Sequence, residues 1–143
     1  MSTHQLAHLH TILKKNGHQI TTTRETMFRM LLKSEPETMN EIILKAHGIV
    51  DRVSVYRNID LFERLGIVHR VYIGWKYKIE LTDAFIEHHH HLSCLNCGKI
   101  IDIQDHGDID DFIKKITLKY NFKPRRHQFE IDGICPDCQL AVS

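Results

Sequence analysis

The sequence contains no long hydrophobic run, and no stretch approaches the roughly 20 apolar residues that cross a membrane. It also lacks internal repeats and low-complexity segments, which argues against repeat and disordered architectures. No secretory segment is apparent, so we expect a cytoplasmic protein with reduced thiols and no membrane partner. The 143 residues, 42% of them hydrophobic, suffice for two small cores.

Cysteine is scarce as well, and its spacing is informative. The four cysteines form two Cys-x-x-Cys pairs, Cys94 with Cys97 and Cys135 with Cys138. Four thiolates in such pairs make a complete tetrahedral set for structural Zn²⁺, because a two-residue gap lets both sulfurs face one ion. The 37 residues between the pairs predict a small domain folded between them. Two disulfides or two redox pairs are the alternatives, which reduced thiols and the lack of a spare cysteine disfavour.

Histidine, in contrast, is abundant, and four of the 12 histidines form the run His88–His91 just before the first cysteine pair. On a β-strand, alternation would send His88 and His90 to one face and His89 and His91 to the other. One run would then supply two metal sites. A solvated basic patch is the alternative, but such a patch has no reason to adjoin a zinc knuckle.

The net charge of +1 conceals an uneven distribution. Residues 1–78 carry twelve Lys and Arg against seven Asp and Glu, whereas residues 79–143 carry seven against eleven. A basic half joined to an acidic, ligand-rich half indicates a polyanion binder attached to a cation binder.

Three helices are predicted at the start of the basic half. Leucines at helical spacing predict a first helix that stops at Gly17. Two apparent capping boxes, Thr22 with Glu25 and Thr38 with Glu41, predict the starts of the second and third helices.

A fourth helix is expected from about Asp51 to Leu65, followed by a β-hairpin around Gly74. Its predicted buried positions are Val55, Ile59 and Phe62. Tyr56 and Arg57 project from the other side, where they would reach bases or phosphates in the major groove. These elements together describe a winged helix-turn-helix. An ordinary surface role for Tyr56 and Arg57 is the alternative.

The acidic half predicts a small α/β unit. Strands are expected at Lys99–Ile103 and His127–Asp132, on either side of an amphipathic helix. The apolar stripe of that helix comprises Ile109, Phe112, Ile113, Ile116 and Tyr120. So small a unit has little interior, so we expect zinc and a partner subunit to complete it.

The chain resembles the ferric uptake regulator (Fur) family over nearly its whole length. The motifs that carry this resemblance are Leu13–Gly17, Thr21–Arg24, Ser54–Arg57, Leu65–Val68, His88–Lys99 and Gly133–Cys138. The resemblance implies an α+β protein, with a winged-helix DNA-binding domain at 1–82 and a zinc-containing dimerisation domain at 83–143. It implies a homodimeric, metal-responsive repressor that binds a palindromic double-stranded DNA operator, has no small-molecule substrate and is not an enzyme.

The resemblance also assigns site residues. The regulatory metal site falls on Glu80, His89, His91 and Asp102. A second metal site falls on His88, His90, Asp110 and His127. DNA-binding positions fall on Lys15, Ser54, Tyr56 and Arg57. Such mixed imidazole and carboxylate ligands suit several divalent ions; the resemblance makes Fe²⁺ the leading expectation, with Mn²⁺ or Zn²⁺ as alternatives.

The sequence departs from the family pattern near the regulatory site. A histidine common just before the third helix is absent, so either Glu35 or Glu37 replaces it or the site lacks a ligand from the DNA-binding domain. The longer hinge leaves Asp83 or Glu87 as substitutes for Glu80, and Gln19 stands where a basic residue is common.

Other functions stay open from the sequence. One is peroxide sensing, in which iron oxidises a ligating histidine. The others are a zinc-dependent hydrolase with Glu87 as its base, and a metal buffer that does not bind DNA.

Overall fold

The computed structural model describes residues 3–104 and 107–142, and the chain divides into two compact units. The first comprises Met1–Tyr72 and Lys76–Ile86, and the second comprises Ile73–Trp75 and Glu87–Ser143. The domain boundary expected after residue 82 stays a prediction. None of the described helices is both long and apolar enough to span a bilayer.

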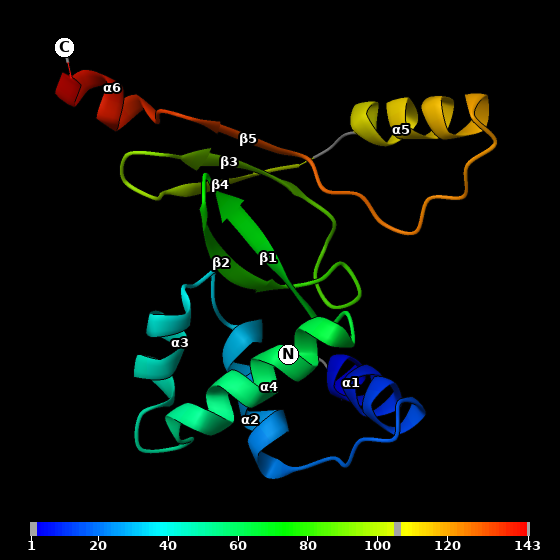
Figure 1. The fold of residues 1–143 in the computed structure, drawn as a ribbon, viewed down its shortest axis with the longest axis vertical. Coiled ribbons are helices and arrows are strands. Elements are labelled where there is room, and N and C mark those ends of the chain that lie inside the picture. Colours follow the sequence, from blue (N-terminus) through cyan, green and yellow to red (C-terminus); the bar gives the residue numbers. More distant parts are fainter. Residues whose placement is uncertain (1–2, 105–106, 143) are drawn as a thin grey trace. The chain divides into compact units, whose positions relative to one another are not determined.

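The first unit contains the four predicted helices and the hairpin except for its tip, Ile73–Trp75, which is grouped with the second unit (Figure 1). Its elements are α1 (Thr3–Lys15), α2 (Thr22–Leu32), α3 (Met39–Ala46), α4 (Arg52–Arg64), β1 (Val68–Ile73) and β2 (Lys76–Leu81). This arrangement is the winged helix-turn-helix that the sequence predicts, with the hairpin as the wing.

One apolar core holds the first unit together. The predicted inward positions of α4, Val55, Ile59 and Phe62, are all buried, and Phe62 is completely inaccessible. Phe85, which follows β2, packs edge-to-face on Phe28 of α2 with ring centroids 4.9 Å apart. Each such side chain contributes about 1.5–3 kcal/mol by leaving water.

Local caps fix where the helices of the first unit begin. The capping box of α3 is confirmed, because Thr38 Oγ1 accepts from the Glu41 amide at 3.2 Å and Glu41 Oε2 accepts from the Thr38 amide at 2.8 Å. At α4, Asp51 is the N-cap and accepts from the Ser54 amide at 2.9 Å. Gly66, just beyond α4, has φ +72°, a conformation that suits glycine at a helix end.

The predicted capping box at Thr22 is wrong. The N-cap of α2 is Thr21, whose side chain accepts from the Arg24 amide at 3.2 Å. Oε1 of Glu25 instead lies 2.6 Å from Nε2 of His10 on α1. Three adjacent threonines can each cap a helix, and this contact with α1 engages the carboxylate that the predicted box requires.

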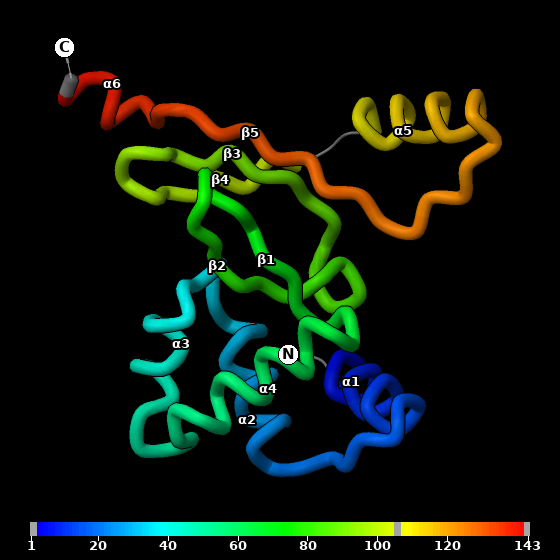
Figure 2. Tube along the Cα trace, in the orientation of Figure 1, coloured from blue at the N-terminus to red at the C-terminus, as the bar shows by residue number. Residues whose placement is uncertain are grey.

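The second unit is built on a three-stranded sheet. Its elements are β3 (His90–Cys94), β4 (Ile100–Ile103), α5 (Asp108–Lys119), β5 (Glu130–Gly133) and α6 (Pro136–Val142). The strand order is β4-β3-β5, with β3 antiparallel to β4 and parallel to β5. Figure 2 traces the long connection from α5 back to β5. The expected strands and helix are present, although β5 starts later than His127, and α6 was not predicted.

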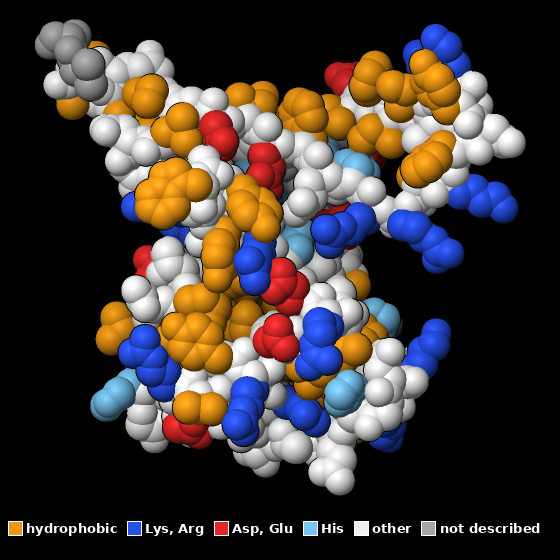
Figure 3. Space-filling model, viewed as in Figure 1, with side chains coloured by type: hydrophobic (Ala, Val, Ile, Leu, Met, Phe, Trp, Pro, Cys, Tyr) orange, Lys and Arg blue, Asp and Glu red, His pale blue; other side chains and the backbone are white. Residues whose placement is uncertain are grey.

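The interior of the second unit is small. The predicted amphipathic helix forms, but α5 buries none of its residues, and Phe112, Ile116 and Tyr120 are exposed. Figure 3 shows hydrophobic side chains gathered over α5. The sequence periodicity therefore predicted the apolar stripe correctly, but within the single chain these three side chains remain exposed.

Candidate metal centres and DNA-binding helix

The four cysteines converge in the second unit. Their sulfur atoms all lie within 4.8 Å of one another, and Cys97 Sγ is 3.8 Å from Cys135 Sγ. Sulfurs bound tetrahedrally at about 2.3 Å from zinc would be about 3.8 Å apart. All four thiols are free of disulfides. The set therefore fits the structural zinc site that the spacing predicts.

Parallel pairing of β3 with β5 explains how two distant cysteine pairs meet. Cys94, the last residue of β3, lies beside Gly133, the last residue of β5. Two residues later, the amide of Cys135 donates to Cys94 Sγ at 3.3 Å. The 37 intervening residues are needed because β4, α5 and the long connection must return the chain to the same end of the sheet.

Hydrogen bonds around the four thiols favour ionisation of one of them, Cys94, even without a bound metal. The hydrogen bond from the Cys135 amide, helped by the Cys97 amide, lowers the pKa of Cys94 to about 6. For Cys138, a hydrogen bond with Asn96 lowers the pKa, but contacts with Cys135 and burial outweigh it and raise the pKa to about 12. A bound cation supplies the charge that four adjacent thiolates require.

The histidine run separates into two pairs, as alternation predicts. The ring centroids of His88 and His90 are 4.8 Å apart, and those of His89 and His91 are 4.7 Å apart. Only His90 and His91 lie within β3, because the strand begins at His90. The alternation nevertheless extends to the two residues before the strand.

The second predicted metal site is assembled entirely within the second unit. Its ligand atoms, from His88, His90, Asp110 and His127, all lie within 4.8 Å of one another. Asp110 Oδ1 is 3.6 Å from His88 Nε2 and 3.5 Å from His127 Nε2. Among the described residues, buried His127 Nε2 has no hydrogen-bond partner. Buried polar atoms normally have partners, so the donors and their spacing fit a divalent ion.

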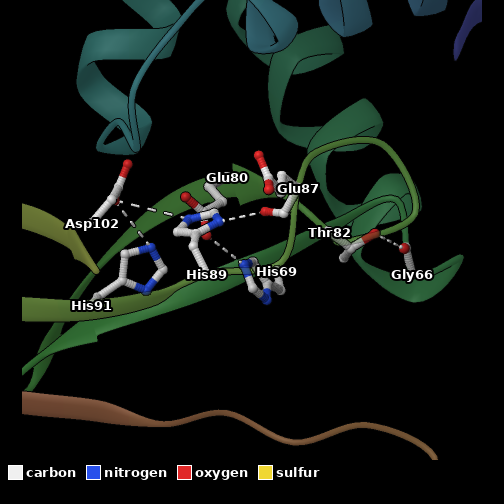
Figure 4. A network of polar contacts seen from close by, with 8 residues as sticks. All are labelled: Gly66, His69, Glu80, Thr82, Glu87, His89, His91 and Asp102. Atoms are coloured by element: carbon white, nitrogen blue, oxygen red, sulfur yellow. Dashed lines mark hydrogen bonds and ion pairs between the residues drawn. The ribbon is translucent and has the colours of Figure 1, made fainter. Parts of the chain in front are cut away.

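The residues of the predicted regulatory site come from both units. In the second unit, Asp102 lies opposite His91 on the paired strands β4 and β3. Its Oδ1 is 3.6 Å from His91 Nε2 and 3.9 Å from His89 Nε2 (Figure 4). His89 Nδ1 donates to the Glu87 carbonyl at 2.7 Å, so Nε2, the ring nitrogen nearer Asp102, is the one that would bind an ion.

Glu80, the fourth predicted regulatory ligand, belongs to β2 of the first unit. It is buried at 7% exposure, and its Oε1 lies 2.9 Å from Nε2 of His69 on β1. The proposed substitutes for Glu80, Asp83 and Glu87, are both exposed. Sequence reasoning missed His69, because only the pairing of β1 with β2 brings it to Glu80.

The predicted DNA-binding positions lie in the first unit. Tyr56 and Arg57 are exposed on α4, and Lys15 is exposed at the end of α1. The hydroxyl of Ser54 donates to Asp51 Oδ2 at 2.7 Å, so it takes part in the cap of α4. Their contacts with DNA stay predictions.

Comparison with known proteins gives one consistent result. The model of the ferric uptake regulator family matches residues 15–132. The peroxide-responsive repressor PerR of Staphylococcus saprophyticus is 31% identical over 140 residues, covering 95% of this chain and 93% of that protein. The ferric uptake regulation protein of Legionella pneumophila is 33% identical over 133 residues, covering 89% and 96%. The solved structure of the Helicobacter pylori ferric uptake regulator Fur matches with a TM-score of 0.74 and 29% identity, covering 95% and 92%.

Proposed function

The chain belongs to the ferric uptake regulator family, and on that premise we propose that it is a homodimeric transcriptional repressor with Fe²⁺ as its corepressor. Members of this family are metal-dependent regulators rather than enzymes. The relative from Legionella pneumophila is named for ferric uptake regulation, and the Helicobacter pylori protein is described as having three functional metal-binding sites.

The division of the histidine run is the observation that carries this proposal. One pair of rings is joined by Asp110 and His127, and the other pair lies beside Asp102. Imidazole and carboxylate ligands together suit Fe²⁺, Mn²⁺ and Zn²⁺. A purely structural protein would need only the four-cysteine set.

The regulatory site would use His89, His91 and Asp102 of the second unit with Glu80 of the first. When bound, the ion would supply the positive charge that these four ligands coordinate. Ligands drawn from both units favour one arrangement of the units over others, and a coupling of roughly 1–3 kcal/mol is typical of such linkage. In a symmetric dimer, that arrangement sets two copies of α4 at the spacing of a palindromic operator.

The dimer would form through the second unit. Phe112 and Ile116 of α5 are exposed there, as is Tyr120 just after the helix, and contiguous apolar patches on soluble proteins mark interaction surfaces. The first unit would then be free to contact DNA through Lys15, Tyr56 and Arg57, with Ser54 at the start of the same helix.

Removal of both regulatory rings tests the proposal. The variant His89→Ala with His91→Ala should lose metal-dependent binding to an operator selected from random duplex DNA, measured by fluorescence anisotropy with and without Mn²⁺. The matched control is His4→Ala, which removes an exposed histidine of α1. Unchanged metal dependence in the double variant would refute the regulatory role.

Peroxide sensing is a second candidate, because the relative from Staphylococcus saprophyticus is a peroxide-responsive repressor. Iron held by these ligands would supply the redox chemistry, in which hydrogen peroxide oxidises a ligating imidazole by two electrons. One peroxide oxygen atom would enter a ring C–H bond and the other would leave as water. Mass spectrometry of the His88–His91 peptide after peroxide treatment distinguishes the two functions. A gain of one oxygen atom supports peroxide sensing, and an unmodified peptide supports metal sensing alone.

A further inference from the structure

We propose that His69 is a metal ligand, which forms with Glu80 a two-residue ligand pair in the wing of the first unit. This inference rests on the proposed regulatory function, and it names the imidazole that the DNA-binding unit contributes. Neither the spacing of the motifs nor the family resemblance assigns a role to His69.

The environment of Glu80 requires a positive partner. Glu80 is 7% exposed, and it lies on the face of β2 opposite to its core neighbours Ile79 and Leu81. A buried carboxylate is costly unless a cation or several donors neutralise it. His69 lies on the facing strand with its side chain 18% exposed, close enough for both groups to serve one ion.

The separation within the pair suits shared coordination. His69 Nε2 and Glu80 Oε1 are 2.9 Å apart (Figure 4). Two ligands bound at about 2.1 Å and at right angles to each other would be about 3.0 Å apart. The distance between these two donor atoms would therefore change little if both bound one ion.

The alternatives from the sequence fit less well. Glu35 is exposed. Glu37 is buried, but its Oε1 accepts from Lys45 Nζ at 2.9 Å, so its charge already has a partner. Backbone hydrogen bonds between Glu37 and Ile79 fix this segment against β2. His69 is therefore the better candidate for the missing imidazole.

The test counts imidazoles around the ion rather than repression. The full chain, with zinc in its cysteine site and with the second site disabled by Asp110→Ala and His127→Ala, is loaded with one equivalent of Co²⁺. X-ray absorption should then count one fewer imidazole in His69→Gln than in its parent, and the visible Co²⁺ bands should change. Affinity for Co²⁺ should fall on the order of 100-fold, at the upper limit for loss of a supporting residue.

Glutamine is chosen because its amide still donates to Glu80 but is a poor ligand. The matched control is His47→Gln, which removes an exposed histidine of the same unit and should leave the imidazole count unchanged. In the unsubstituted chain, ¹⁵N spectra of labelled histidine should show the Nε2 signal of His69 shifting on addition of Zn²⁺, which avoids any question of misfolding.

The outcomes separate this inference from the proposed function. If His89→Ala with His91→Ala abolishes Co²⁺ binding but His69→Gln retains the parent's imidazole count, the role of His69 is refuted and the regulatory site stands. If the double variant binds Co²⁺ with an unchanged spectrum, the regulatory site is refuted, and the role of His69 with it.

Discussion

The two units of this protein achieve stability by different means. The first buries apolar side chains from four helices and a hairpin, including Phe28 and Phe62 at 0% exposure. In the second, the buried hydrophobic cluster among the described residues consists of Cys94, Cys135 and Cys138. We expect a unit with so little apolar interior to depend on the proposed bound ions and partner subunit. Loss of metal should then unfold the second unit and leave the first unit folded.

Removal of the structural zinc should have the largest effect. Binding of a structural zinc ion is worth on the order of 10 kcal/mol, and this energy is folding energy for a small metal-dependent unit. Cys135→Ser with Cys138→Ser should therefore unfold the second unit, whereas the amide signals of α1–α4 should keep their dispersion in ¹H–¹⁵N spectra.

The control for this experiment is Asp110→Ala with His127→Ala, which removes two ligands of the second site and leaves the four cysteines in place. This variant should remain folded in both units. If the cysteine variant lost the signals of both units, the two units would fold as one. The first unit would then not be stable independently of the zinc site.

The proposed dependence of the second unit on a partner subunit is tested by the variant Phe112→Asp, on α5. Phe112 is 63% exposed, and burial of a phenylalanine is worth about 1.5–3 kcal/mol. Placing a charge there should raise the dimer dissociation constant at least about 100-fold, measured by sedimentation equilibrium.

Leu44→Asp provides the comparison for the other unit, because Leu44 is a 75% exposed apolar residue of α3. This change should leave the dimer intact. Equal dissociation of both variants would mean that the apolar surface of α5 has no special role in assembly.

How far the sequence predicted this structure also differs between the units. Periodicity located α4 and its buried residues, because one face of a helix is a local pattern. The cysteine spacing predicted each pair of the four-cysteine set, because the gap within a pair is also local, whereas the meeting of the two pairs depends on the pairing of β3 with β5. The pairing of His69 with Glu80 depends on two strands meeting, and periodicity within either strand does not record it. The periodicity of α5 predicted its apolar stripe, but no pattern within one chain identifies the partner that the proposed dimer would place on Phe112.

The smallest predicted effect concerns a local device of the first unit, the Asp51 cap of α4. Asp51→Ala removes the acceptor for the Ser54 amide and hydroxyl, and it should lower the Tm of the first unit by a few degrees, measured by circular dichroism on the zinc-loaded chain. Asp60→Ala is the control, since its contact with Arg64 is exposed on both sides and worth little.

The stabilisation by the Asp51 cap should also depend on pH, and the hydrogen bonds of Asp51 with Ser54 determine the direction of that dependence. Hydrogen bonds from the side chain and amide of Ser54 lower the pKa of Asp51 below its ordinary value of 3.8. The folded chain therefore binds this proton less readily than the unfolded chain, so the stabilisation is complete above the ordinary value and is lost as the pH falls through the lower, folded value. The difference in Tm between the parent and Asp51→Ala should shrink over that interval, whereas Asp51→Asn, which keeps an acceptor without a charge, should show no such titration. A difference that stays constant in acid would mean that the charge of Asp51 contributes nothing to the cap.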